Sequence, residues 1–533
     1  MRELRRFEAE GFHVVTVDGA EGPVRAHLLP DPSAVAAAGV PIHANLYRAA
    51  ARVELPGLGA ILLKVHRPRG LGDGLLAALR GSRARAEWDA ARYLAGAGIP
   101  TPEPLVVAER RHGLALEQAA SGTRFLPARE TFEPALGRQP AAKAHALLAR
   151  AARWIRALHD RGVSHRDLHS GNVLVGPGPG DRTTIDVVDL HTVRHGHAPS
   201  RRLRERQLAQ WLHSLLGSTG PGGRLRSLEA YLGPDVPRAD VARARARVDR
   251  EIARRERVRV RSRSRRCVEE SGTFTHDVGA GKQGVRRRDL APAALDAALA
   301  AHERVLAARG DALLKAGPKS LVSRVPGAIV KERLARTWRR RLEHALLPAR
   351  ARRGYANAHG LEVRGFSTAT PLAFVRRGGR IFTLYRDLAP SPRLDHRVRE
   401  AVRGREWSRR RLREVSDAFA DLAARLHRKG VWHGDWKACN FLLDERGPRV
   451  SFPLLDTDRL RFRRVVSTAR RLRNLAQLDA SLPKVVSRTE RLRWFRRYAR
   501  GGALAGPAAE RAALRRVGRL VARKLVVVDE PIE

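Results

Sequence analysis

Apolar residues recur at helical spacing in two distant parts of the chain. The first series is Leu148, Ala151, Ile155 and Leu158, and the second is Phe419, Leu422 and Leu426. Steps of three and four residues place side chains on one face of a helix. A glycine soon after the last apolar residue is a common helix end, and Gly162 and Gly430 stand there. The pattern therefore predicts one helix before each of these glycines.

Short apolar runs predict strands that end at residues with useful chemistry. The runs AILLK and AIVK predict strands that end at Lys64 and Lys331. A later apolar pair in each half predicts another strand, which ends at Asp189 or at Asp456. Each predicted helix is separated from this later strand by a polar loop and a short apolar run, so the loop lies between a helix and a sheet.

The two loops share one skeleton, HRDLHSGNVLV from His165 and HGDWKACNFLL from His433. Each has an Asp two residues after the His and an Asn five residues after that Asp. The offset between the halves is 268 for Asp167 and Asp435 and for Asn172 and Asn440, and 267 for Lys64 and Lys331 and for Asp189 and Asp456. A nearly constant offset over this length indicates two copies of one domain.

The length of 533 residues suits more than one domain. We predict a first domain over residues 1–235, a basic linker over 236–265 and a second domain over 266–533. The run VARARARVDREIARRERVRVRSRSRR, from Val241, is compatible with a charged helix or with a linker arm. A solvated connector is the favoured interpretation, because few apolar residues interrupt the arginines.

The composition indicates a folded protein that carries a large positive charge. Hydrophobic residues make up 43% of the chain and the formal net charge is +48. The charge favours an anionic partner such as a phospholipid surface or a phosphorylated glycolipid, although arginine-rich coding bias explains a large part of it. No apolar run reaches membrane-spanning length, the N-terminus is charged, and there are two cysteines. We therefore expect a cytoplasmic protein without a disulfide framework.

The repeated residues are the parts of a kinase-type phosphoryl-transfer site. In the first copy Lys64 is expected to hold the α- and β-phosphates of the donor, and Asp167 to orient the attacking hydroxyl. Asn172 and Asp189 supply the oxygen ligands that Mg²⁺ prefers. Glu87 lies in a segment compatible with a helix and is the expected ion-pair partner of Lys64.

The second copy retains Lys331, Asp435, Asn440 and Asp456 in the same expected roles. It lacks the glutamate, since Gly354 occupies the position 267 residues after Glu87. Glu343 is a substitute that nothing in the sequence requires. Neither copy has a G-x-G-x-x-G phosphate loop, and His165 and His433 are interpreted as packed structural residues. The second copy is therefore either a second active site or a degraded copy that supports the first.

Longer stretches resemble one family of enzymes. The segment KVHRPRGLGDGLLAALRGSRARAEWDAARYLAGAGIPTPEPL, LHDRGVSHRDLHSGNVLV and VVDLHTVR are similar to the lipopolysaccharide core kinases that phosphorylate Kdo or heptose. In the second half, LLKAGPKSLVSRV and HGDWKACNFLL are similar to the same family. The resemblance implies an α+β fold of two tandem protein-kinase-like bilobal domains, each with a small sheet-bearing lobe and a larger helical lobe.

The resemblance also implies a reaction and a place. The donor is expected to be ATP with Mg²⁺, and the acceptor a sugar hydroxyl of the lipopolysaccharide inner core or another anionic glycolipid. The expected location is the cytoplasm, with peripheral contact to the anionic inner face of the inner membrane. The catalytic residues implied are Asp167 and Asp435.

Three other functions remain open from the sequence. One is a Ser/Thr protein kinase or a kinase for another small molecule, since the loop pattern is shared among kinases. Another is a pseudokinase scaffold at the membrane, above all for the second copy. Specific nucleic-acid binding is the weakest, because aromatic residues are 5% of the chain and none are interleaved with the arginine runs. The sequence indicates no oligomeric state.

Overall fold

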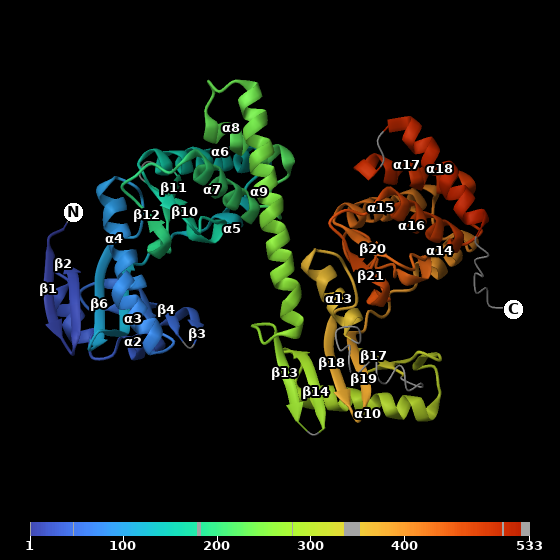
Figure 1. Cartoon of the computed structure of the whole chain (residues 1–533), viewed down its shortest axis with the longest axis horizontal. Helices are drawn as coiled ribbons and strands as arrows, with labels where there is room; N and C mark the ends of the chain where they lie inside the picture. The colour runs from blue at the N-terminus through green and yellow to red at the C-terminus, as the bar shows by residue number, and fades with distance from the viewer. Residues whose placement is uncertain are drawn as a thin grey trace. The chain divides into compact units, whose positions relative to one another are not determined.

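The structure is a computed structural model, and it describes residues 2–45, 47–178, 183–279, 281–334, 352–503 and 506–523. The chain divides into two compact units, residues 1–257 and 258–533, and each holds one copy of the repeat (Figure 1). Both units have a small lobe built on a seven-stranded sheet and a large lobe built mainly of helices. This confirms the predicted α+β class and the two bilobal copies.

The small lobe of unit 1 is an antiparallel sheet in the order β1-β2-β6-β7-β5-β4-β3. Its strands are β1 (Leu4–Ala9), β2 (Phe12–Val17), β3 (Val40–Asn45), β4 (Arg48–Leu55), β5 (Gly59–His66), β6 (Pro104–His112) and β7 (Ala115–Arg124). Its helices are α1 (Glu21–His27), α2 (Pro32–Ala38), α3 (Leu71–Arg80) and α4 (Arg83–Gly96). In β5, Ile61 and Leu63 are fully buried in the core of the lobe. Because strand side chains alternate between the two faces, Lys64 lies on the face opposite to these two residues.

The large lobe of unit 1 holds the loop that begins at His165 between helices and short strands. The helices are α5 (Phe132–Gly137), α6 (Ala141–Asp160), α7 (Arg201–Ser214) and α8 (Pro221–Leu232), with the 3-10 turns η1 (Ser170–Asn172) and η3 (Leu190–Thr192). The strands are β8 (Glu130–Thr131), β9 (Ser164–His165), β10 (Val173–Pro177), β11 (Thr183–Val187) and β12 (Val193–Arg194). Helix α6 is the helix predicted before Gly162, and that glycine has a φ of 74°, a backbone conformation that glycine adopts at helix ends.

The basic run between the copies is largely one helix, α9 (Arg238–Arg265). Its first turns bury Ala244, Val248 and Ile252 in the core of the large lobe of unit 1. The predicted linker of residues 236–265 is therefore a helix with one packed face in its first half, where a solvated connector was favoured. Few apolar residues are enough for this, because they recur at four-residue spacing along one face.

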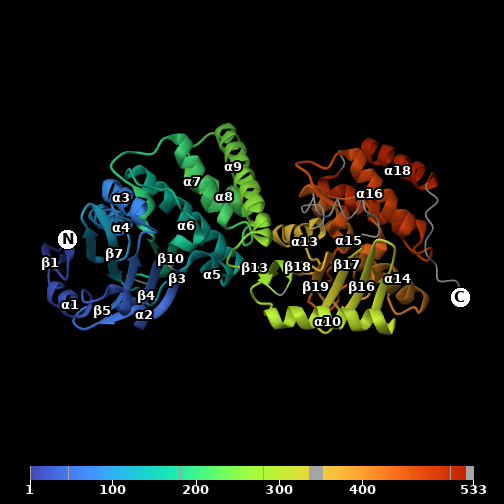
Figure 2. The ribbon, with the colours of Figure 1, turned by 60° about the horizontal axis from the view of Figure 1, so that its bottom comes forward.

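The small lobe of unit 2 repeats the topology of unit 1, in the order β13-β14-β18-β19-β17-β16-β15. Its strands are β13 (Phe274–Gly279), β14 (Lys282–Arg287), β15 (Leu313–Ala316), β16 (Ser320–Val325), β17 (Ala328–Arg333), β18 (Pro371–Arg377) and β19 (Arg380–Arg386). Figure 2 shows α10 (Pro292–Ala308) lying across β16 and β17. Leu295 and Leu299 of this helix are buried in the core of the lobe. Helix α13 (Arg353–Val363) occupies the position of α4.

The large lobe of unit 2 is again mainly helical. It contains α14 (Leu394–Arg403), α15 (Arg409–Arg428), α16 (Thr468–Ser481), α17 (Arg488–Tyr498) and α18 (Gly506–Ala522), with β20 (Val431–His433), β21 (Leu460–Phe462), the turns η5 (Ala438–Asn440) and η6 (Thr457–Arg459) and the π-helical turn η7 (Ala499–Ala503). Helix α15 is the helix predicted before Gly430, whose φ is 76°.

The prediction of a strand that ends at Asp456 is wrong, because this segment forms isolated bridges and no extended strand. Phe441 and Leu454 form only isolated bridges, whereas the equivalent segments of unit 1 are the paired strands β10 and β11. Pro453 explains the difference, because proline has no N–H with which to continue the ladder.

Candidate active site

The lysine of β5 forms a buried ion pair in unit 1. Ser82 caps α4 by accepting a hydrogen bond from the Arg85 N–H at 3.0 Å, which starts the helix one turn before Glu87. Lys64 Nζ lies 2.5 Å from Glu87 Oε1, and the two side chains are 10% and 6% exposed. Removing one partner of such a pair typically costs about 3–5 kcal/mol. The predicted partnership of Lys64 and Glu87 is therefore present in the structure.

Asp189 sits at the entrance of η3 in a left-handed backbone conformation, with φ at 59°. Such a conformation costs energy for a residue other than glycine, and it is concentrated at functional sites. Its Oδ1 atom lies 3.4 Å from Lys64 Nζ, 3.0 Å from an Arg48 nitrogen and 3.2 Å from His191 Nδ1. Burial would raise the pKa of Asp189, but the hydrogen bond from His191 and the charges of Lys64 and Arg48 outweigh it and lower that pKa well below its ordinary value.

The loop of residues 165–172 in unit 1 is held by contacts with the backbone. His165 is buried, accepts a hydrogen bond from the Asp167 N–H at 3.1 Å and lies 3.2 Å from the Val188 carbonyl. Asn172 donates its amide hydrogen to the Asp167 carbonyl at 2.9 Å. The loop and the strand end at Asp189 are thus tied together, which confirms that His165 is a packed structural residue.

The carboxylate of Asp167 faces polar side chains. Gln210 donates to Oδ1 at 3.1 Å and His169 Nε2 lies 3.6 Å from Oδ2. The hydrogen bond with His169 lowers the pKa of Asp167. An ionised carboxylate here is suited to accept or orient the proton of an attacking hydroxyl.

Asn172 and Asp189 suit a hard cation. The side-chain N–H of Asn172 is used in the loop, which leaves its amide oxygen as a ligand. The Val188 N–H donates to the Asn172 carbonyl at 3.0 Å, so the chain segments that carry the two oxygen donors lie side by side. One amide and one carboxylate oxygen, completed by phosphate oxygens and water, match the preference of Mg²⁺.

Unit 2 builds the same loop from different residues. His433 accepts from the Asp435 N–H at 3.1 Å and lies 2.9 Å from the Asp456 carbonyl. Asn440 donates to the Asp435 carbonyl at 2.8 Å, and the Leu455 N–H donates to the Asn440 carbonyl at 2.7 Å. Asp456 is again left-handed, with φ at 46°. Asp435, Asn440 and Asp456 are therefore arranged as their counterparts in unit 1 are.

The lysine of unit 2 has a partner that the sequence reasoning missed. Lys331 Nζ lies 2.6 Å from Asp458 Oδ2 and 3.3 Å from Asp456 Oδ1. Arg333 also contacts Asp458. Gly354 faces the same carboxylate, and a Cβ at position 354 would overlap it. The absence of a glutamate at position 354 of α13 is therefore matched by an aspartate that fills its place from η6.

The electrostatics of this pair are mutual. Burial opposes both charges, but Asp458 raises the pKa of Lys331, and the charges of Lys331 and Arg333 lower the pKa of Asp458. One feature of the sequence could have indicated that Asp458 partners Lys331. Asp458 stands 267 residues after His191, so an acidic residue replaces a basic one at this position of the repeat. Glu343, the substitute considered from the sequence, lies outside the described residues.

The family model for the lipopolysaccharide kinase (Kdo/WaaP) family matches residues 70–244 and 327–498. The two matches together cover more than half of the chain. The chain belongs to this family. The match confirms the family predicted from the sequence, the assignment to the kinases and the presence of two copies.

Known proteins resemble the chain over one copy at a time. The lipopolysaccharide core heptose(I) kinase WaaP of Pseudomonas aeruginosa is 30% identical over 180 residues, which cover 31% of this chain and 66% of the relative. A solved structure of WaaP in complex with acyl carrier protein has 25% identity and a TM-score of 0.34, over 42% of this chain and 91% of that chain. An aminoglycoside-3'-phosphotransferase of type VIII has 18% identity and a TM-score of 0.27, over 39% and 90%.

Among the described residues, no helix combines the length and the apolar character needed to cross a bilayer.

Proposed function

We propose that unit 1 transfers the γ-phosphoryl group of ATP to a sugar hydroxyl of the lipopolysaccharide inner core. The observation that carries the proposal is that the buried Lys64–Glu87 pair contacts the left-handed Asp189, which lies beside the loop of Asp167 and Asn172. The curated relative is a heptose(I) kinase by its name, which favours heptose over Kdo as the acceptor.

In this proposal each group has one task. Lys64, oriented by Glu87, holds the α- and β-phosphates. Asp167 accepts the hydrogen bond of the attacking hydroxyl, a role generally worth about 10²–10⁴ in rate. Asn172 and Asp189 hold Mg²⁺, which neutralises charge on the transferred phosphoryl group when bound. Since Arg48 also contacts Asp189, it stands close enough to add a second positive charge beside that group.

We propose in addition that unit 2 binds nucleotide. Asp458 supports this, because it supplies the carboxylate that Lys331 needs while Asp435, Asn440 and Asp456 keep their arrangement. If unit 2 binds ATP but transfers no phosphate, it is a pseudokinase. We further propose action at the cytoplasmic face of the inner membrane, where the charge of +48 would favour contact with anionic lipid.

The test is transfer of labelled γ-phosphate from Mg·ATP to dephosphorylated lipopolysaccharide core. The full chain is compared with Asp167→Asn, Asp435→Asn and the double variant. We expect Asp167→Asn to reduce core labelling by about 10²–10⁴. Core labelling that is unchanged in the double variant would contradict the assignment of both aspartates. Labelled protein without labelled core would identify a protein kinase instead.

A further inference from the structure

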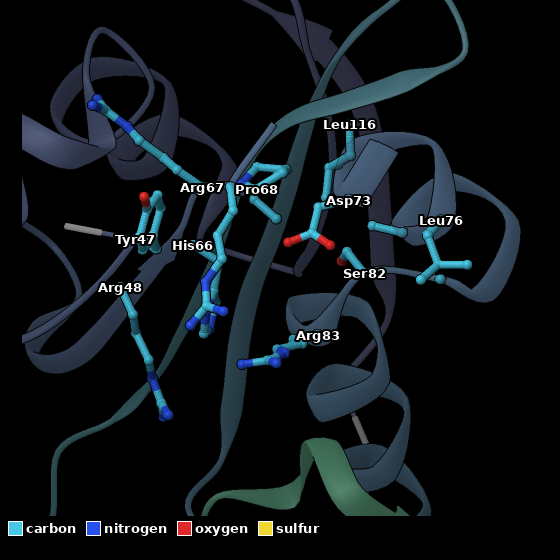
Figure 3. Close-up of a pocket in the computed structure, with 14 residues that line it drawn as sticks. Tyr47, Arg48, His66, Arg67, Pro68, Asp73, Leu76, Ser82, Arg83 and Leu116 are labelled. Carbon is cyan, nitrogen blue, oxygen red and sulfur yellow. The ribbon is translucent and has the colours of Figure 1, made fainter. Parts of the chain in front are cut away.

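A basic cavity of about 540 Å³ opens in the small lobe of unit 1. Arg48, His66, Arg67 and Arg83 are among the residues that line it (Figure 3), and they come from β4, β5, the segment after β5 and α4. The remaining wall includes Asp73 and apolar side chains from α3 and β7. A cavity of this size is in the range of small-molecule sites, about 300–1,000 Å³, and it is larger than one phosphate group requires.

The cavity adjoins the phosphoryl-transfer residues through three elements. Arg48 lines it and also lies 3.0 Å from Asp189. His66 stands two residues after Lys64 in β5 and therefore on the same face of the strand. Arg83 stands four residues before Glu87 in α4, one helical turn away. Three of the residues that line the cavity are thus neighbours of Asp189, Lys64 or Glu87.

Of the four arginines that line the cavity, Arg48 is paired with Asp189, and the other three form no ion pair with a carboxylate among the described residues. Within the part of the chain that the structure describes, Arg67, Arg69 and Arg83 have no carboxylate partner. Arg67 donates instead to Ser33 Oγ at 2.9 Å, and Arg69 lies over the ring of Tyr47. Burial and the neighbouring charges of Arg48, Lys64 and Arg83 lower the pKa of His66 to about 3. The histidine is therefore neutral, and the positive charge comes from arginines, which stay charged at every physiological pH.

The walls combine charge with apolar surface. Leu76, Ala77, Leu116 and Ala119 line the cavity together with the arginines. A triphosphate chain has no apolar atoms to pack against these side chains. A sugar ring that carries an anionic group has carbon atoms for the apolar side chains and a charge for the arginines. Arginine is also the side chain best suited to bind phosphate or carboxylate through paired hydrogen bonds.

We infer that this cavity binds an anionic substituent, a phosphate or a carboxylate, on the acceptor sugar. Unit 1 then selects an acceptor that is already charged and positions a hydroxyl of it beside Asp167. The inference rests on the proposed function and extends it from a class of reaction to a specificity site.

The experiment uses the full chain with Asp435→Asn, so that only unit 1 transfers phosphate. The test variant adds Arg67→Gln and Arg83→Gln. The matched control adds Arg150→Gln and Arg202→Gln, which remove the same charge from exposed positions on α6 and α7. Inorganic phosphate and acetate serve as probes, both as inhibitors of transfer to the core and in calorimetric titrations without ATP or acceptor.

We expect phosphate, acetate or both to inhibit competitively against the core and not against ATP, and the stronger inhibitor identifies the anion. The test variant should weaken binding of that probe and raise the KM for the core by about tenfold or more, since it removes two charge-assisted contacts. Its KM for ATP should change by less than about twofold, and the control should match the parent.

Two results would overturn the inference. Competition of the probes with ATP, together with a raised KM for ATP, would make the cavity part of the donor site. Equal probe binding in the test variant and the control would show that the cavity holds no anion. If the parent chain labels no core at all, the proposed function fails, while the calorimetric titration still reports on the cavity.

Discussion

In unit 1 the carboxylate beside the strand lysine comes from the helix α4, whereas in unit 2 it comes from the turn η6. Glu87 is 23 residues after Lys64, and Asp458 is 127 residues after Lys331. The exchange involves three positions. Glu87, His191 and His66 in unit 1 are replaced at the same offset by Gly354, Asp458 and Arg333 in unit 2.

The difference shows that both units place a carboxylate beside the strand lysine, although the residue that supplies this carboxylate stands at a different position in the sequence. Gly354 leaves room for Asp458, and Arg333 adds a second positive charge beside the new acid. Replacing Asp458 alone would remove the carboxylate that contacts both Lys331 and Arg333, and a glutamate at position 354 alone would place two like charges together. The three residues are therefore one arrangement, and the loss of the glutamate alone does not indicate a degraded site.

The largest effect is expected from removing the carboxylate in each copy. Glu87→Gln in unit 1 and Asp458→Asn in unit 2 should each weaken ATP binding to their own unit by roughly 10- to 100-fold, because a charge-assisted hydrogen bond contributes about 1.5–3 kcal/mol. Fluorescent-nucleotide titration measures this, with the other unit silenced by Lys331→Met or Lys64→Met. Asp479→Asn, a partly exposed acid on α16, is the control. If Asp458→Asn binds ATP as the parent does, the two acids are not equivalent.

The exchange itself can be reversed in unit 2. Gly354→Glu alone should weaken nucleotide binding by about tenfold or more, because the new side chain meets Asp458 and adds a like charge. Adding Asp458→His to it gives unit 2 the residues of unit 1 at two of the three positions and should restore binding to within about fivefold of the parent. The same titration measures both variants. A double variant no better than Gly354→Glu would mean that the two positions act independently.

A smaller effect, common to both copies, is expected in acid. His159 contacts the Tyr231 hydroxyl at 2.7 Å and Gln207 at 2.9 Å, and His427 contacts Tyr498 at 2.7 Å and Asn474 at 3.2 Å. Burial lowers the pKa of both histidines to about 4.

The sign of the pH dependence follows from that lowered pKa. The unfolded chain takes up protons near pH 6.5 and the folded units do so only near pH 4, so stability is complete above 6.5 and falls as the pH decreases. Each histidine should account for roughly 3 kcal/mol of lost stability at pH 4. Thermal unfolding between pH 7.5 and 4 measures it. His159→Gln and His427→Gln should flatten the profile of their own unit, and unchanged slopes would assign the acid sensitivity to other groups.

Much of the site could be predicted from the sequence because its parts are local. Asp167 and Asn172 are five residues apart in one loop, and the strand that carries Lys64 and the helix that carries Glu87 each have a clear pattern. The repeat doubled the signal, since Lys331, Asp435, Asn440 and Asp456 recur at nearly the same offset. The helix before each glycine was predicted for the same reason.

The contacts that sequence reasoning missed are long-range. Arg48 reaches Asp189 across 141 residues, and Lys331 reaches Asp458 across 127. Neither has a spacing rule, because the separation depends on the lengths of every element in between. The packed face of α9 was also missed, because its three buried apolar residues are outnumbered by arginines in the sequence.

The sequence by itself determined the duplication and the identity of the lysine, the aspartates and the asparagine in each copy, whereas the bilobal fold followed from the resemblance to a known family. The repeat and the site residues could be predicted because they depend on local periodicity and on short motifs, which can be recognised without the structure. Only the tertiary structure decided which acid partners each lysine, and that arginines from three separate elements surround one cavity beside Asp189. Charges find their partners through space, and the folding of the lobes sets the distances on which Coulomb interactions depend.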